Sequence, residues 1–129
     1  ITYKPSPSQK SIIRRIFSII NSTLGTGELT FDTNIEHILP QKPQIWGLSE
    51  DEVADYVNNI GNLTLIQKQL NSRMGNKPFS EKLPLLLESE IRVNSTIEEH
   101  LVDGEWTEEG IRKRAEFLAS ICDDATRGV

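Results

Sequence analysis

Apolar side chains recur at helical spacing near the start of the chain. Ser8 is a residue that can cap a helix, and Gly25 and Gly27 end the pattern. The apolar positions between them are Ile12, Ile13, Ile16, Phe17, Ile19, Ile20 and Leu24. This spacing predicts an amphipathic helix over residues 9–24.

The pattern then changes to one typical of β-structure. Residues 29–39 alternate loosely and are rich in Thr, Phe and Ile before Pro40, which predicts a strand. Residues 62–66 are a second β-prone run. Between the two, Ser49 is placed to cap a short helix through residue 58, with acidic residues in its first turn where the helix dipole favours them.

Helical spacing returns after the second strand. Leu70 and Met74 share a face in a predicted helix over residues 67–74, which Gly75 ends. Two more helices are expected, one over residues 80–89 and a last one capped by Thr107. The order of elements predicts an α+β fold, with a core over residues 29–76 and C-terminal helices within residues 79–122.

The length of 129 residues suits one domain. Residues 1–8 are polar and interrupted by two prolines, which is typical of a linker, so we expect a single domain over residues 9–129 and a missing N-terminal region. No apolar stretch approaches the roughly 20 residues of a membrane span, and no signal peptide is recognisable. We therefore expect a soluble cytoplasmic protein with no membrane partner.

Charge and cysteine content narrow the candidate chemistry. One cysteine, Cys122, and two histidines exclude a disulfide framework and a four-ligand zinc site. The net charge of −5 argues against a domain that coats nucleic acid. Residues 67–82 nevertheless hold four cations against one acid, and they form a candidate basic strip: Lys68, Arg73, Lys77 and Lys82.

The pair Glu36–His37 at the end of the first predicted strand is the main candidate for chemistry. A neutral imidazole with a pKa near 6.5 can deprotonate a water, and a hard cation held by oxygen ligands can neutralise a phosphodiester. Glu36 and Asn71 can supply such oxygens. Neighbouring strand residues face opposite sides, so the strand must end and turn here. Asn62 is placed to hydrogen bond the backbone of that turn.

These residues resemble a known family. The order Glu36-His37-x-x-Pro40-Gln41, then Asn62, then Asn71 is similar to the His-Asn-Asn form of the HNH (ββα-metal) nuclease motif. The surrounding sequence, over most of residues 12–119, resembles the C-terminal nuclease domain of GmrSD-type, SspE-like modification-dependent restriction enzymes. The words that carry this resemblance are EHILPQ, IGNLTL, LNS, GNKPF and Lys82.

The resemblance implies a ββα-metal core and a Mg²⁺- or Mn²⁺-dependent DNA endonuclease or nickase that serves in anti-phage restriction. It implies His37 as general base, Glu36 and Asn71 as metal ligands, and Asn62 as the residue that orients the loop. It further implies an N-terminal domain that hydrolyses nucleoside triphosphate and senses modified DNA. The DNA-contacting candidates are Lys68, Arg73, Asn76, Lys77 and Lys82.

Each of these features also has a structural interpretation. Glu-His pairs at strand ends occur by chance, Gly61-Asn62 can be a turn, and the basic strip can be a solvated helix face. Trp46 and Trp106 are expected to pack, and His100 to lie on the surface without a role. Two alternative functions stay open: a non-catalytic interaction module of the same fold, and an RNase.

Overall fold

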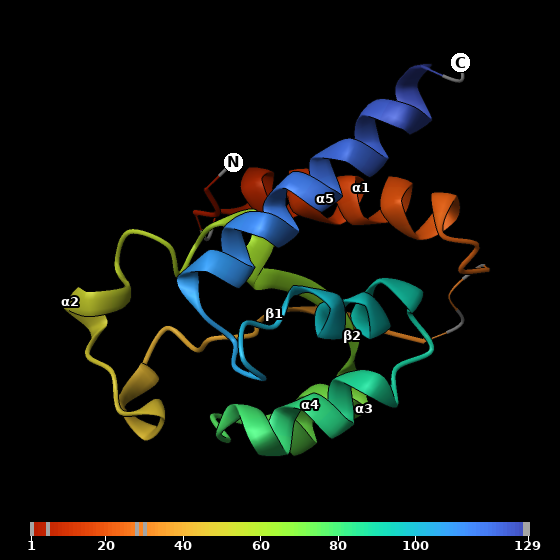
Figure 1. Cartoon of the computed structure of the whole chain (residues 1–129). Coiled ribbons are helices and arrows are strands. Elements are labelled where there is room, and N and C mark those ends of the chain that lie inside the picture. Colours follow the sequence, from red (N-terminus) through yellow and green to blue (C-terminus); the bar gives the residue numbers. More distant parts are fainter. Residues whose placement is uncertain (1, 5, 28, 30, 128–129) are drawn as a thin grey trace.

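The computed structural model describes residues 2–4, 6–27, 29 and 31–127 (Figure 1). A two-stranded antiparallel sheet lies at its centre, formed by β1 (Thr33–His37) and β2 (Leu63–Gln67). The register pairs Ile35 with Leu65 and His37 with Leu63. Helices lie on both sides of this sheet, so the predicted α+β class is confirmed.

The long helices form near their predicted positions. Helix α1 (Pro7–Thr23) begins two residues early, because Ser6 caps it by accepting a hydrogen bond from the Gln9 backbone and Pro7 suits the first turn. The remaining α-helices are α2 (Glu50–Val53), α3 (Lys68–Met74), α4 (Phe79–Leu87) and α5 (Glu108–Arg127). The predicted cap at Ser49 is present as a capping box with Glu52.

Several element boundaries differ from the prediction. Strand β1 is confined to the stretch that pairs with β2 and is shorter than the predicted residues 29–39, of which residue 30 lies outside the described part. Helix α2 ends at Val53 rather than at the predicted residue 58, and turns follow Val53. The 3₁₀ segments η1 (Pro43–Trp46), η2 (Ile60–Asn62) and η3 (Arg92–His100) were not predicted.

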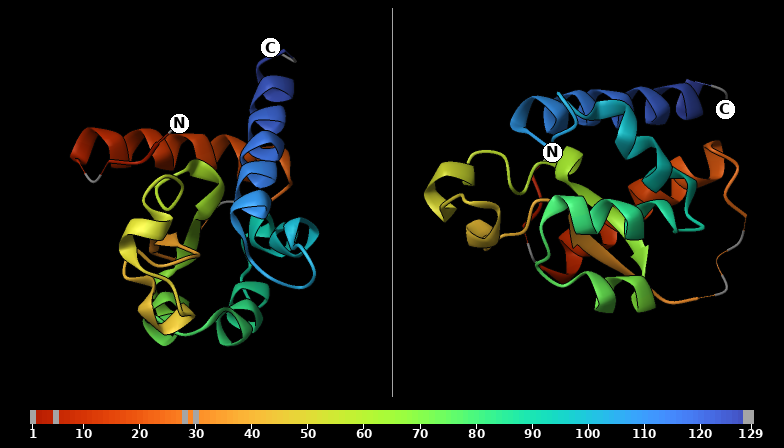
Figure 2. Two further views of the ribbon diagram at one scale, coloured as in Figure 1. Left: turned by 60° about the vertical axis from the view of Figure 1, so that its left-hand side comes forward. Right: turned by 60° about the horizontal axis from the view of Figure 1, so that its bottom comes forward.

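The sheet separates two hydrophobic clusters, because alternate strand residues face opposite sides. One cluster joins Ile66 to α3 and α4 and includes Leu70, Met74, Leu86 and Trp106. The other joins Leu63 and Leu65 to α1 and α5 and includes Ile13, Phe17 and Leu118. Helices α1 and α5 cross and contact each other on this second side (Figure 2).

A buried arginine of helix α5, Arg114, connects this helix to the start of β2. Arg114 is fully buried and donates hydrogen bonds to the carbonyl oxygens of Gly61 (2.9 Å) and Leu63 (2.6 Å). The close approach needs a residue without a side chain, since a Cβ atom on Gly61 would collide with the carbonyl oxygen of Ile111. Among the described residues, no helix combines the length and the apolar character of a membrane span.

Candidate active site

His37 is the last residue of β1, two residues before the predicted end of the strand at residue 39. Its Nε2 atom lies 2.8 Å from Oδ1 of Asn58, and Gln41 Nε2 donates to the same oxygen at 3.5 Å. An amide oxygen only accepts hydrogen bonds, so Nε2 carries the proton and Nδ1 keeps its lone pair. The imidazole is therefore held in the tautomer that leaves Nδ1 free to act as a base.

The surroundings of His37 favour its neutral form. Burial lowers the pKa of His37; the hydrogen bond with Asn58 opposes this effect, and the positive charge of Lys82 adds to it. The ring also packs against Tyr3, with 5.8 Å between the ring centroids. A neutral imidazole at physiological pH is the state that a general base requires.

His37 and Asn71 line the same cavity, whose volume is about 320 Å³. Helix α1 contributes two cations to its wall, Lys10 and Arg14, and no carboxylate of the described residues lines it. The remaining lining residues are Tyr3, Asn34, Ile35 and Gln41. In a chain with a net charge of −5, an acid-free wall with two cations is a local environment suited to an anion.

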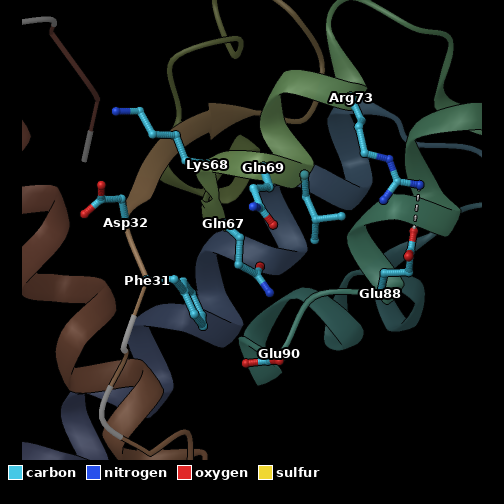
Figure 3. A pocket seen from close by; sticks show the side chains of 9 residues that line it. Phe31, Asp32, Gln67, Lys68, Gln69, Arg73, Glu88 and Glu90 are labelled. Carbon is cyan, nitrogen blue, oxygen red and sulfur yellow. Dashed lines mark hydrogen bonds and ion pairs between the residues drawn. The ribbon is translucent and has the colours of Figure 1, made fainter.

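A larger cavity of about 740 Å³ lies on another side of α3 and has a different character (Figure 3). Lys68 and Arg73 line it, but so do the carboxylates Asp32, Glu88 and Glu90. Arg73 pairs with Glu88 at 3.5 Å, as the dashed line in Figure 3 shows. Three carboxylates repel a phosphodiester, so the larger volume of this cavity does not make it the binding site for such a substrate.

Glu36 lies beside Lys82 of α4 and is not among the residues that line the cavity with His37. Its Oε2 atom lies 3.9 Å from Nζ of Lys82, and 15% of the Glu36 side chain is exposed. Burial raises the pKa of the Glu36 carboxyl, while Lys82 and a hydrogen bond from the His37 backbone both lower it. The two adjacent residues thus face different neighbours, as strand geometry requires.

Lys82 does not lie in an exposed basic strip, and that expectation is wrong. Its side chain is fully buried, and Nζ donates hydrogen bonds to the carbonyl oxygens of His37 (3.0 Å) and Ile38 (2.9 Å). Leu85 and Leu86, next to it on α4, are buried in the core, so this part of the helix faces inward. Lys82 supports the backbone beside His37 and is not available to DNA.

Asn62 is buried at the start of β2, and all of its side-chain hydrogen bonds are directed inward. Oδ1 accepts from the Leu39 backbone N–H (2.8 Å) and from Trp106 Nε1 (3.0 Å). Nδ2 donates to the carbonyl oxygens of Leu39 (2.9 Å) and Val57 (2.8 Å). This amide therefore fixes the loop that follows His37 and leaves no lone pair directed toward a metal.

The other predicted DNA-contacting residues do not line the cavity with His37. Lys68 and Arg73 line the larger cavity, and Asn76 and Lys77 are exposed after α3, where the Lys77 carbonyl accepts a hydrogen bond from Trp46. Both tryptophans pack against Phe79, as predicted. His100 is half-buried, with its ring against Phe117.

Sequence reasoning missed three groups around His37. Asn58 is 21 positions away and gave no signal, since its approach depends on tertiary packing. The i,i+4 spacing of Lys10 and Arg14 could have indicated a basic helix face. Tyr3 falls in the predicted linker, yet it is buried and its backbone N–H donates to the Asn58 carbonyl at 2.7 Å.

Glu36 and Asn71 carry the kinds of oxygen that a hard divalent cation prefers, and of the two only Asn71 lines the cavity with His37. Glu36 offers a carboxylate and Asn71 an amide oxygen, and the 3.9 Å separation from Lys82 is longer than a hydrogen bond, so Glu36 retains lone pairs. Among the described residues, no group of three or more His, Cys, Asp or Glu could hold a metal. Mg²⁺ fits such a site, because it is commonly bound by one or two protein oxygens, waters and substrate phosphates.

Comparison with known proteins gave one match. The family described as GmrSD restriction endonucleases, C-terminal domain, matches residues 2–121. No curated protein and no solved structure matches the chain.

Proposed function

The chain belongs to the family of GmrSD restriction endonuclease C-terminal domains, and on that premise we propose that it is an HNH-type, divalent-metal-dependent DNA endonuclease. The observation that carries this proposal is the cavity in which His37 and Asn71 meet two cations and, among the described residues, no carboxylate. Hydrolysis of a phosphodiester needs a base and compensation for negative charge. This cavity offers both, and β1, β2 and α3 would form the ββα-metal core.

His37 would act as the general base. Its Nδ1 takes a proton from a water, whose oxygen attacks phosphorus as the bond from phosphorus to the departing sugar oxygen breaks. Asn58 accepts the Nε2 hydrogen throughout and stabilises the imidazolium that forms. Asn62 and Lys82 keep the loop after His37 in place, so the imidazole does not need to reorient during the reaction.

Glu36 and Asn71 would hold the cation, Mg²⁺ or Mn²⁺. Bound there, it would supply positive charge to the phosphoryl and departing oxygens. One such centre holds one strand at a time, so nicking is the expected product of a single domain. We further propose that the parent protein is cytoplasmic, acts in anti-phage restriction, and has an N-terminal domain that hydrolyses nucleoside triphosphate and senses DNA modification.

The test is conversion of supercoiled plasmid to open circle in Mg²⁺ or Mn²⁺, with EDTA as the metal-free control. We expect His37→Ala to lower the rate by about 10²–10⁴-fold, the usual contribution of a general base. His37→Gln is the matched variant, because its amide can still donate to Asn58 but cannot take the proton. Full activity in both variants would refute the assignment of His37.

The alternatives predict other outcomes. Parallel digestion of plasmid, single-stranded DNA and RNA separates a DNA nuclease from an RNase, since the chemistry itself does not depend on the 2′-hydroxyl. Absence of cleavage on all three substrates, by this chain and by its full-length parent, would favour a non-catalytic interaction module.

A further inference from the structure

Two cations on α1 lie beside the proposed base. Lys10 and Arg14 are four residues apart, so they share one face of the helix, and both line the cavity that contains His37. Helix α1 lies on one side of the sheet and α3, which carries Asn71, on the other (Figure 1). The cavity therefore extends around β1, which is an edge of the two-stranded sheet.

Arg14 is held in place by the first residue of β1. Its Nη1 donates to Thr33 Oγ1 at 2.9 Å and its Nη2 to the Thr33 carbonyl oxygen at 3.1 Å. A guanidinium has five N–H donors, so those not used by Thr33 stay available. An arginine ordered in this way loses less side-chain entropy when it binds an anion.

No described acid neutralises this pair. Within the described part of the chain, neither Lys10 nor Arg14 takes part in an ion pair, and the cavity wall carries no carboxylate. Like charges at i,i+4 on a helix repel each other. A bound anion would remove that repulsion.

We propose that Lys10 and Arg14 form a binding subsite for backbone phosphates of the DNA strand, on the α1 side of His37. The proposal rests on the proposed function and adds the path of the DNA strand. The DNA strand would cross the edge of the sheet at β1, from α1 toward Asn71. Arg14 supplies a planar fork that matches a phosphate, and Lys10 a flexible point charge. The phosphate contacts nearest the base therefore come from α1, not from the strip over residues 67–82.

The test measures DNA binding without cleavage. A short fluorescein-labelled DNA duplex is titrated with the protein in EDTA at several salt concentrations, and its anisotropy gives the association constant. Each lost phosphate contact reduces the slope of log K against log salt by about 0.9. The double variant Lys10→Gln/Arg14→Gln should therefore reduce the slope by about 2.

Arg15→Gln is the matched control, because Arg15 is an exposed cation on the same helix that does not line the cavity. This variant should keep the original slope. Arg14→Lys keeps a charge while it loses the fork, so it should keep the slope and weaken binding. If the double variant does not fold, Lys10→Gln alone should reduce the slope by about 1.

A folded double variant with an unchanged slope would overturn the subsite, as would an equal reduction in Arg15→Gln or a lack of DNA binding at low salt. The plasmid assay separates this result from failure of the proposed function. Nicking with an unchanged slope leaves the nuclease and removes the subsite. A reduced slope without nicking, by this chain and by its full-length parent, leaves the subsite and removes the nuclease.

Discussion

Two buried polar side chains, Asn62 and Lys82, hold the loop that follows His37. Asn62 fills its amide hydrogen-bonding capacity with Leu39, Val57 and Trp106. Lys82 donates to the carbonyl oxygens of His37, the last residue of β1, and of Ile38, which follows it. Buried polar atoms are costly unless they are paired, so these contacts specify one loop conformation rather than a set of similar ones.

Replacing Lys82 tests its structural role. In Lys82→Met the free energy of unfolding at neutral pH should fall by about 2–3 kcal/mol, because Glu36 and two carbonyl oxygens lose their partner. Urea denaturation measures this change. The salt slope of DNA binding should stay the same, since Lys82 is buried.

The double variant Lys82→Met/Glu36→Gln is the control for the charge. Removing the unpaired carboxylate should recover part of the lost stability. A Lys82→Met protein with unchanged stability and a smaller salt slope of DNA binding would instead indicate that Lys82 contacts DNA.

At the scale of elements, the contact between η2 and α5 positions the start of β2. Gly61 lies directly against the α5 backbone, and Arg114 bonds the carbonyls on either side of Asn62. Segment η3 supports the same strand, because Asn94 is buried, donates to the Leu65 carbonyl at 2.9 Å and accepts from Thr64. The position of Asn62, and through it the loop after His37, thus depends on α5 and η3.

A methyl group at Gly61 should disturb this contact. Gly61→Ala places a Cβ atom against the Ile111 carbonyl, so α5 must shift, and the free energy of unfolding should fall by about 3 kcal/mol. Gly27→Ala is the matched control, because nothing lies within 4 Å of the added atom. Urea denaturation of both variants checks the difference, and equal stabilities would contradict the close packing.

At the scale of the whole molecule, the two histidines both make the stability of the fold depend on pH in the same direction. Burial lowers the pKa of His100, with Arg114 and Lys113 acting in the same direction and Glu99 against it. Burial likewise lowers the pKa of His37. As the pH falls, these histidines therefore bind protons at a higher pH in the unfolded chain than in the folded one. The free energy of unfolding then rises with pH between the folded and unfolded pKa values.

The expected result is a loss of stability as the pH falls through about 6.5, the ordinary pKa of histidine. His100→Phe should reduce that loss, because it keeps the ring against Phe117 and removes the titrating group. Thermal unfolding of both proteins between pH 7 and pH 5.5 measures the effect. An unchanged pH dependence in His100→Phe would exclude His100 as its source. The raised pKa of Glu36 acts in the opposite direction at lower pH.

Much of the element order was accessible from the sequence, because helix and strand patterns depend on neighbours within four positions. The cap at Ser49 and the helix face of Leu70 and Met74 are of this kind. Segment η3 was missed, since 3₁₀ turns lack the 3.6-residue apolar period and this one is held by contacts with β2.

The sequence by itself determined the α+β order and the residues capable of the chemistry, His37, Glu36 and Asn71, because residue type and local spacing carry that information. Only the tertiary structure decided which groups surround His37. It brought Asn58, Lys10 and Arg14 to His37, buried Lys82, and placed Glu36 beside Lys82. The physical reason is that these contacts join positions up to 45 residues apart, where packing of separate elements, rather than local periodicity, sets the distances.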